Sequence, residues 1–467
     1  MSEPFSAQEA ADWTGGRLLR GDPAARLDAV GIDSRSVARG SLFVAIAGER
    51  FDGHDFLADA LAAGAAGLVI EAGREAPADT PLLIAVENTT RALGALARGH
   101  RARFSGPVVA ITGSNGKTTT KEMCAAILAT AGPYLKNEGN LNNEFGLPLT
   151  LLRREPEQKS LVVELGMNHR GEIARLAAIA QPTVGVITNV GTAHIEHLGS
   201  REEIALEKGD LVAALGADGV AVLNADDPRV LEQAARTRAR VLRFGFSEEA
   251  EVRALEVRAE ADGHYRFALH CQGRDPVEVR VAGLGSPTVL NALAAAGGAL
   301  AAGFEPGAIA RGLDAYRPVP GRLEPVPLPR GGLLINDTYN ANPQSLEVAL
   351  RTLAQGEPAG ARIAVLGDMG ELGETGDAAH RAAGELAAKL GVDALFALGE
   401  RAGLVAEGAR AAGMPAEAIF TEREDWESLA DRVCARFRAG DRALVKGSRA
   451  MRMERIVERL MKSAGEA

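Results

Sequence analysis

The sequence predicts an α/β protein of three domains. Its 467 residues are too many for one hydrophobic core, so two or three domains are expected. Aliphatic, strand-like runs alternate with helical patterns along most of the chain, which is typical of mostly parallel sheets. Residues 316–332 are rich in proline and glycine and read as a linker before a second α/β unit. We therefore expect domains at residues 1–86, 87–317 and 318–467.

The first domain is predicted to be a small α/β unit. Strand-like runs occur in residues 41–48, 65–72 and 81–88, and residues 52–65 have the pattern of a helix. Residues 89–104 are expected to form a helix that connects this unit to the next one.

The second domain begins with a buried strand that runs into a glycine turn and a helix. The further strands of its parallel sheet are expected at 160–166, 183–190, 219–225 and 240–246. Residues 251–282 alternate like antiparallel strands appended to that sheet, and residues 289–303 form a closing helix. The third domain repeats the alternation in a Rossmann-like unit, with strands expected within 332–337, 361–368, 394–400 and 442–448.

Composition excludes several classes of protein. A formal net charge of −10 argues against general nucleic-acid binding, which needs a basic surface. Three widely spaced cysteines without a CxxC pair fit a reducing compartment and no zinc site. The first residues lack the basic and apolar regions of a signal peptide, and no apolar run approaches the ~20 residues that span a bilayer. We expect a cytoplasmic monomer without membrane insertion.

The segment TGSNGKTTT predicts a phosphate loop. It follows a strand and opens a helix, so backbone N–H groups would surround phosphates, with Lys117 reaching the β- and γ-phosphates and the Thr118 hydroxyl binding Mg²⁺. Ile111 stands where the general GxxxxGK[ST] pattern has its first glycine, and a chance glycine turn is the alternative. The predicted ATP-binding residues of this loop are Gly113, Ser114, Asn115, Gly116, Lys117, Thr118 and Thr119.

Polar residues follow the next two strands of the predicted sheet. Glu164 ends one strand, and Asn189 and His194 follow another. Ligands of open α/β sheets bind at the carboxyl ends of the strands, so these side chains should converge near the loop. Glu164 is a candidate Mg²⁺ ligand, with a turn or cap acid as the alternative. His194 is a candidate ligand, although an isolated histidine is more often structural.

Lys208 lies on the apolar stripe of a predicted helix over residues 201–215. The stripe contains Ile204, Leu211, Val212 and Leu215, whereas the opposite, wet face would carry Glu202, Glu203, Glu207 and Asp210. From this helix alone, a lysine whose stem packs and whose ammonium reaches water is the favoured interpretation.

The loop TGSNGKTTTKEM, together with Glu164, His194 and the segment EKGD at Lys208, resembles the muramyl ligases. Those enzymes use ATP to form the peptide bonds of peptidoglycan precursors, and their loop also lacks the first glycine. The resemblance implies two Mg²⁺ ions held by Thr118, Glu164, His194 and a Lys208 that CO₂ has carbamylated. It also implies that Lys117, His194 and Lys208 are catalytic.

The outer regions resemble one member of that family. DSRSVARGSLF and the following helix look like the part that holds the UDP end of the substrate, which implies contacts from Ser34, Arg35 and His54. A salt-bridged surface arginine is an equally good interpretation of Arg35. The segment NEGNLNNEFG implies substrate contacts from Asn140, Asn142 and Asn143, with a capped loop as the alternative.

The segments NDTYNANPQSL and LGDMGELG resemble the member that adds D-alanyl-D-alanine to UDP-N-acetylmuramoyl-tripeptide. The resemblance implies that Tyr339, Asn340 and Asn342 line the dipeptide pocket; turn and cap chemistry is the alternative. The other implied contacts are Asn291 with adenine, Asp337 with ribose, Arg322 with the γ-phosphate and Lys446 with developing phosphate charge. Pro287 and Thr288 replace the family's His–Asn pair beside Asn291, so histidine contacts to the nucleotide are not expected.

The implied activity is ATP-dependent ligation through an acyl phosphate. Two alternatives remain open. One is a folylpolyglutamate or cyanophycin-type ligase, which the N-terminal segment and NDTYNANP argue against. The other is a phosphate-loop protein that uses ATP as a switch or motor, in which Glu164, His194 and Lys208 would have no use.

Overall fold

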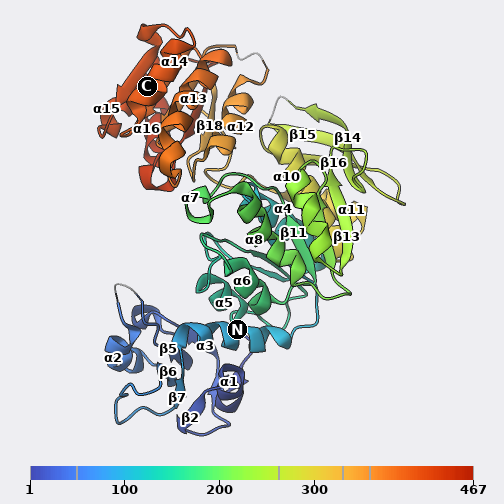
Figure 1. Cartoon of the computed structure of the whole chain (residues 1–467), viewed down its shortest axis with the longest axis vertical. Helices are drawn as coiled ribbons and strands as arrows, with labels where there is room; N and C mark the ends of the chain where they lie inside the picture. Colours follow the sequence, from blue (N-terminus) through green and yellow to red (C-terminus); the bar gives the residue numbers. More distant parts are fainter. Residues whose placement is uncertain (1, 49–50, 261–262, 329–330, 357–358, 466–467) are drawn as a thin grey trace.

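The computed structural model describes residues 2–48, 51–260, 263–328, 331–356 and 359–465. Figure 1 shows an elongated molecule with the N-terminal part at one end, the central part in the middle and the C-terminal part at the other end. Each part contains its own sheet with helices around it, which confirms the predicted α/β class and the three units. The predicted limits at 86/87 and 317/318 fall between the sheets and stay predictions.

The N-terminal sheet has five strands in the order β2-β7-β6-β5-β4. Neighbouring strands are parallel except β2 and β7. The bounds are β2 Arg17–Arg20, β4 Ala29–Gly31, β5 Ser41–Val44, β6 Gly67–Glu71 and β7 Leu83–Val86, with a separate pair β1 Phe5–Ser6 and β3 Arg26–Leu27. The helices are α1 Ala7–Thr14, α2 Leu57–Ala62 and α3 Thr89–Ala102. Helix α3 is the predicted connection to the central part, and Asn88 caps its start.

The central sheet has nine strands in the order β16-β15-β14-β13-β12-β11-β8-β10-β9. The pairs from β9 to β14 are parallel, and β14, β15 and β16 are antiparallel, as predicted for residues 251–282. The strands are β8 Val108–Thr112, β9 Tyr134–Lys136, β10 Ser160–Glu164, β11 Val184–Ile187, β12 Val220–Asn224, β13 Arg240–Gly245, β14 Val252–Ala259, β15 His264–Cys271 and β16 Val277–Ala282. The helices are α4 Lys117–Leu128, α5 Gly146–Leu151, α6 Glu172–Ala180, α7 Ile195–Leu198, α8 Arg201–Ala213, α9 Pro228–Leu231, α10 Ser286–Ala301 and α11 Pro306–Ala315.

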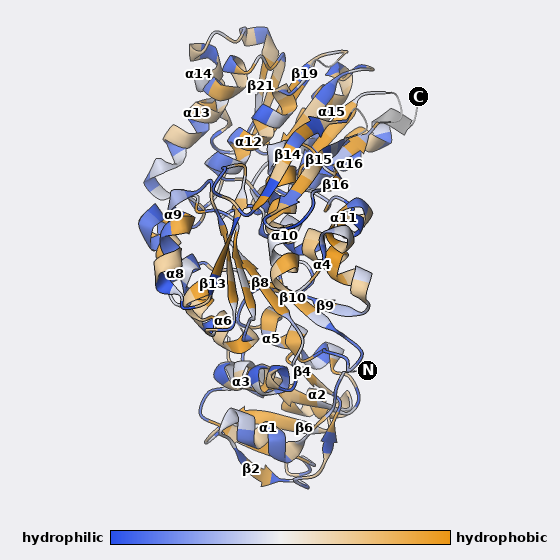
Figure 2. Ribbon diagram, turned by 90° about the vertical axis from the view of Figure 1, so that its right-hand side faces the viewer, coloured by the Kyte–Doolittle hydropathy of each residue, from blue (hydrophilic) through white to orange (hydrophobic). Residues whose placement is uncertain are grey.

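Helices cover both faces of this central sheet, and β8 shows why. Val108 and Ala110 pack into the core that includes residues of α3, α5, α6 and α8. Val109 and Ile111, which point the other way, pack into the core that includes residues of α4, α10 and α11. Figure 2 shows the hydrophobic strands between these layers. With both faces covered, ligands have access at the carboxyl ends of the parallel strands.

The C-terminal sheet has six strands in the order β17-β18-β22-β19-β20-β21, and only the β17–β18 pair is antiparallel. The strands are β17 Glu324–Pro327, β18 Leu333–Asp337, β19 Arg362–Gly367, β20 Ala394–Leu398, β21 Ile419–Glu422 and β22 Arg442–Lys446. The helices are α12 Pro343–Ala354, α13 Gly376–Lys389, α14 Ala402–Ala411, α15 Trp426–Arg436 and α16 Glu454–Gly465. Strand β17 lies inside the segment predicted as linker, so that prediction was wrong there. Its two prolines are tolerated because β17 is an edge strand.

No helix in the described part of the chain is long and apolar enough to cross a lipid bilayer.

Candidate active site between the three units

A cavity of about 1320 Å³ lies among the three units. Its lining comes from α3, the loop after β8, the ends of β10 and β11, the start of α10, and the C-terminal segments that follow Gly321 and Asp337. The carboxyl ends of the central parallel strands therefore open into one space that is closed on one side by the C-terminal unit.

The loop after β8 has the backbone of a phosphate-binding turn. Gly113 has φ +152°, and a Cβ atom there would lie 1.9 Å from Thr188 Oγ1. Gly116 has φ +80° and caps α4, and a Cβ there would lie 2.3 Å from Asn291 Oδ1. Both positions require glycine because of the left-handed backbone and the close neighbours.

The turn after β11 supports this loop. The Asn189 side-chain oxygen accepts from Asn115 N at 2.9 Å, and its amide donates back to Asn115 O at 3.0 Å. Lys117 Nζ donates to Gly113 O at 2.9 Å, which places the ammonium over the turn. Desolvation lowers the pKa of Lys117; the Glu164 carboxylate opposes this shift and the Arg322 guanidinium adds to it.

Glu164 is held by protein donors on both carboxylate oxygens. Thr118 Oγ1 donates to Oε2 at 2.7 Å, and Asn142 Nδ2 donates to Oε1 at 2.8 Å. The backbone of Glu164 is fixed as well: Asn137 Oδ1 accepts from its N–H at 2.9 Å, and Asn137 Nδ2 donates to its carbonyl at 3.0 Å. Sequence reasoning missed Asn137, since a buried amide after a short strand carries no recognisable pattern.

His194 lines the cavity where the central and C-terminal units meet. Its Nδ1 lies 2.8 Å from Glu371 Oε2, in the segment LGDMGELG. Both residues have left-handed backbones, with φ of 64° and 58°, which is uncommon outside glycine. The His194 pairing lowers the pKa of Glu371.

Lys208 is buried, with 1% of its surface exposed, together with Ile204, Leu211 and Val212. This confirms the predicted inward face of α8. The snorkelling interpretation is wrong, because the side chain does not reach water. Its ammonium makes no hydrogen bond or ion pair within the described residues, and burial, together with the nearby Lys117 charge, lowers its pKa well below the usual range. It does not line the cavity, but it lies close enough to Lys117, which does, to be affected by that charge.

One acid of α8 departs from the predicted wet face. Glu207 is 5% exposed and accepts from Gly171 N at 2.7 Å and Ile173 N at 2.8 Å. It thereby satisfies the free N–H groups at the start of α6, a role that helical periodicity cannot reveal.

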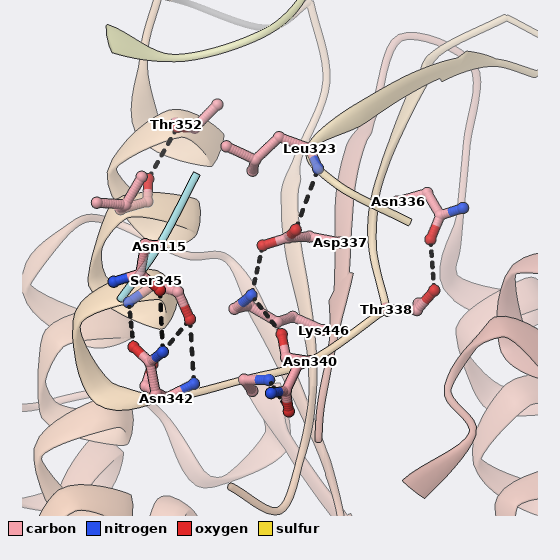
Figure 3. A network of polar contacts seen from close by, with 12 residues as sticks. Asn115, Leu323, Asn336, Asp337, Thr338, Asn340, Asn342, Ser345, Thr352 and Lys446 are labelled. Atoms are coloured by element: carbon pink, nitrogen blue, oxygen red, sulfur yellow. Dashed lines mark hydrogen bonds and ion pairs between the residues drawn. The ribbon is translucent and has the colours of Figure 1, made fainter. Parts of the chain in front are cut away.

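The C-terminal unit contributes a polar network, shown in Figure 3. Lys446 Nζ lies 2.5 Å from Asp337 Oδ2 and donates to Asn340 O at 2.8 Å. The other Asp337 oxygen accepts from Leu323 N at 3.1 Å. Asn342 caps α12 and donates to Asn115 Oδ1 of the phosphate loop at 3.0 Å. This last bond joins the nucleotide loop to the C-terminal unit.

Tyr339 and Arg322 complete this side of the cavity. The Arg322 guanidinium lies 4.0 Å from the centre of the Tyr339 ring, which is a favourable cation–π arrangement. Asn291 lines the cavity behind Gly116. The structure thus brings together the following predicted residues in one cavity lining: Ser114, Asn115, Gly116, Lys117, Thr118, Thr119, Asn140, Asn142, Asn143, Glu164, His194, Asn291, Arg322, Asp337, Tyr339, Asn340, Asn342 and Lys446.

Three predicted substrate residues lie outside this lining. The Arg35 side chain is 86% exposed and pairs with Asp33 at 2.7 Å, which is the surface salt bridge considered above. His54 uses both ring nitrogens, with Nδ1 2.6 Å from Asp52 and Nε2 accepting from Glu71 N at 3.0 Å. Ser34 belongs to the same short turn as Arg35. A role for these three in substrate binding stays a prediction.

Metal ligands are sparse among protein side chains. In the described ranges, no group of three or more His, Cys, Asp or Glu side chains is placed to hold a metal ion. The Asn143 side chain accepts from Phe145 N and Gly146 N and so closes the loop that leads into α5, as in the alternative of a side chain that stabilises its own loop.

Comparison with known proteins identifies the family. Three stretches match the Mur ligase family models for the catalytic domain, the middle domain and the glutamate ligase domain, at residues 26–101, 111–299 and 321–449. The UDP-N-acetylmuramoyl-tripeptide–D-alanyl-D-alanine ligase of Escherichia coli is 38% identical over 447 residues, 94% of each chain.

The chain belongs to the Mur ligase family. Among solved structures, MurF from Acinetobacter baumannii superposes on this Mur ligase with a TM-score of 0.89 at 34% identity, covering 99% of both chains. MurF from Thermotoga maritima, solved in complex with ADP, gives 0.83 at 31% identity, covering 94% of this chain and 98% of that one. Similarity of this extent includes all three units of the Mur ligase.

Proposed function

We propose that this Mur ligase joins D-alanyl-D-alanine to UDP-N-acetylmuramoyl-tripeptide with cleavage of ATP to ADP and phosphate. The observation that carries the proposal is the single cavity in which the phosphate loop faces Tyr339, Asn340 and Asn342 of the C-terminal unit. The full-length similarity to enzymes named for this reaction supports the same substrates.

The reaction has two steps. The tripeptide carboxylate attacks the γ-phosphorus of ATP, the bond from that phosphorus to the β,γ-bridging oxygen breaks, and the products are an acyl phosphate and ADP. The amine of D-alanyl-D-alanine then attacks the acyl carbon, loses a proton, and the tetrahedral intermediate expels phosphate. Lys117 and Arg322 offset the negative charge where carboxylate and triphosphate meet. The Asn342–Asn115 bond holds the C-terminal unit over the loop, which excludes water from the acyl phosphate.

The residues around Glu164 fit magnesium. A hydroxyl and a carboxylate that touch each other, beside a phosphate loop, are the donors that Mg²⁺ uses together with substrate phosphates. We assign Thr118 and Glu164 to one ion, and His194 with modified Lys208 to a second. Bound Mg²⁺ supplies positive charge against the developing phosphate charge. In this assignment, Asn142 holds the Glu164 carboxylate in place and does not contact the substrate directly.

Lys208 fits a carbamate for a physical reason. A neutral amine is the form that combines with CO₂, and burial favours that form because it lowers the pKa of Lys208 well below its usual range. A carbamate at Lys208 would carry a negative charge that the nearby Lys117 ammonium attracts, and its oxygens would be suitable ligands for Mg²⁺.

Phosphate release tests the function. The purified chain, ATP and UDP-N-acetylmuramoyl-tripeptide should release phosphate rapidly only when D-alanyl-D-alanine is present. Lys117→Ala should abolish the release, whereas Lys462→Ala, an exposed lysine on α16, should not change it. Release without the dipeptide would support an ATPase switch instead. Release with a folate or a cyanophycin-type substrate, and none with the UDP-linked substrate, would place the chain elsewhere in the ligase group.

A further inference from the structure

Three arginines without partners line the cavity where the N-terminal and central units meet. Arg91 and Arg98 come from α3 and Arg175 comes from α6. All three are exposed, and in the part of the chain that the structure describes their guanidinium groups have no hydrogen bond, ion pair or ring contact. Other cations in the cavity lining are already engaged: Lys117 with Gly113, Arg201 with Val190, Arg322 with Tyr339, Lys446 with Asp337 and Arg449 with Glu454.

The packing of α3 against α6 brings the three arginines around one point. Gly94 of α3 lies against Ile179 of α6, where a Cβ on the glycine would be 2.9 Å from Ile179 Cδ1. Arg91 and Arg98 lie about one turn before and one turn after Gly94, and Arg175 lies one turn before Ile179. Because residues three or four apart share a helix face, all three side chains flank this contact on the cavity side.

No acid among the described residues forms an ion pair with any of the three arginines. Glu172 also lines the cavity, but its carboxylate accepts from Asn168 N and His169 N and pairs with the His169 ring. The chain as a whole carries a net charge of −10, so the three unpaired arginines on one cavity wall create a positive electrostatic potential that is confined to this part of the surface. Guanidinium groups match phosphate oxygens in geometry and charge, and they bind them through paired hydrogen bonds.

We propose that Arg91, Arg98 and Arg175 form the subsite for the diphosphate of the UDP-linked substrate, an inference that rests on the proposed function. Figure 1 shows α3 on the side of the N-terminal unit, away from the C-terminal unit. The reacting carboxylate belongs at the phosphate loop beside Lys117, so a long substrate lies along the cavity with its nucleotide end at α3. The arginines supply charge there that Ser34, Arg35 and His54 do not bring to the cavity.

Direct binding of UDP to the full chain tests the subsite. Each of Arg91→Ala, Arg98→Ala and Arg175→Ala is expected to weaken UDP binding by about tenfold to a hundredfold, the range of a charge-assisted hydrogen bond. The matched control is Arg311→Ala, because Arg311 is exposed on α11 and does not line the cavity. In turnover, the three variants should raise KM for UDP-N-acetylmuramoyl-tripeptide by a similar factor, with kcat and the KM for ATP nearly unchanged.

Two outcomes separate this inference from the function on which it rests. UDP binding in all three variants equal to that of Arg311→Ala would overturn the subsite, whatever the turnover. Loss of UDP binding in the variants of a chain that forms no product with D-alanyl-D-alanine would uphold the subsite and reject the ligase substrates. Thermal unfolding checks that the variants fold, and Arg→Gln replacements, which keep most of the side-chain length, serve where an alanine variant does not.

Discussion

Replacement of Asn137 by alanine should loosen the carboxylate that faces the phosphate loop. The Asn137 side chain is fully buried and makes three hydrogen bonds: to Leu141 O at 2.9 Å, to Glu164 O at 3.0 Å and from Glu164 N at 2.9 Å. At ~1 kcal/mol net for each bond, Asn137→Ala should lower the free energy of unfolding by about 3 kcal/mol. For a domain of this size that corresponds to a fall of roughly 6–12 °C in Tm.

Urea unfolding measures the stability, and the dependence of turnover on Mg²⁺ concentration measures the position of Glu164. The expected result for Asn137→Ala is a higher Mg²⁺ requirement in addition to the lost stability. Asn143→Ala is the control, because Asn143 is exposed and accepts only two backbone N–H groups near the start of α5, so the same count gives at most about 2 kcal/mol. An Asn137→Ala enzyme within 1 kcal/mol of the parent and with an unchanged Mg²⁺ profile would refute the reasoning.

Three further outcomes are expected. Lys208→Ala should abolish ADP release, and a short-chain carboxylate in the buffer should restore part of it; no restoration would remove the case for a carbamate. Burial lowers the pKa of His100 to about 4, so protonation of this side chain favours the unfolded chain. The contribution of His100 to the free energy of unfolding should be full above pH 6.5 and should fall by up to about 3 kcal/mol as the pH drops toward 4. Urea unfolding at several pH values, compared with a His100→Gln variant, measures this change. At pH 8, iodoacetamide should label Cys434 in the folded chain and leave Cys124 and Cys271 unlabelled, because burial raises the pKa values of these two thiols to about 12 and about 11. Peptide mass spectrometry identifies the labelled cysteines, and a label on either buried thiol would contradict the prediction.

The sequence predicted the elements that repeat a strong pattern. Buried strands such as β8 and β10 consist mainly of aliphatic residues, and the glycines after β8 indicate a turn. The sequence therefore predicted both the phosphate loop after β8 and Glu164 at the end of β10. Strand β17 was not predicted, because backbone pairing at a sheet edge does not require an apolar pattern and because its prolines suggested a linker.

The side-chain partners were less predictable. The inward face of Lys208 followed from helical periodicity, but the burial of Glu207 followed from the start of α6, more than 30 residues away in sequence. The Arg91–Arg98–Arg175 cluster has the same origin, because it depends on α3 meeting α6 at Gly94. Contacts of this kind are set by tertiary packing, which no local window of sequence contains.

The bond between Asn115 and Asn342 has a consequence for inhibition. The turn that would hold the nucleotide is also the segment to which the C-terminal unit is hydrogen-bonded. A small molecule wedged between these two amides would keep the halves of the enzyme apart. Because Asn115 belongs to the loop proposed to bind the phosphates of ATP and Asn342 to the proposed dipeptide pocket, such a molecule would compete with both ATP and the dipeptide.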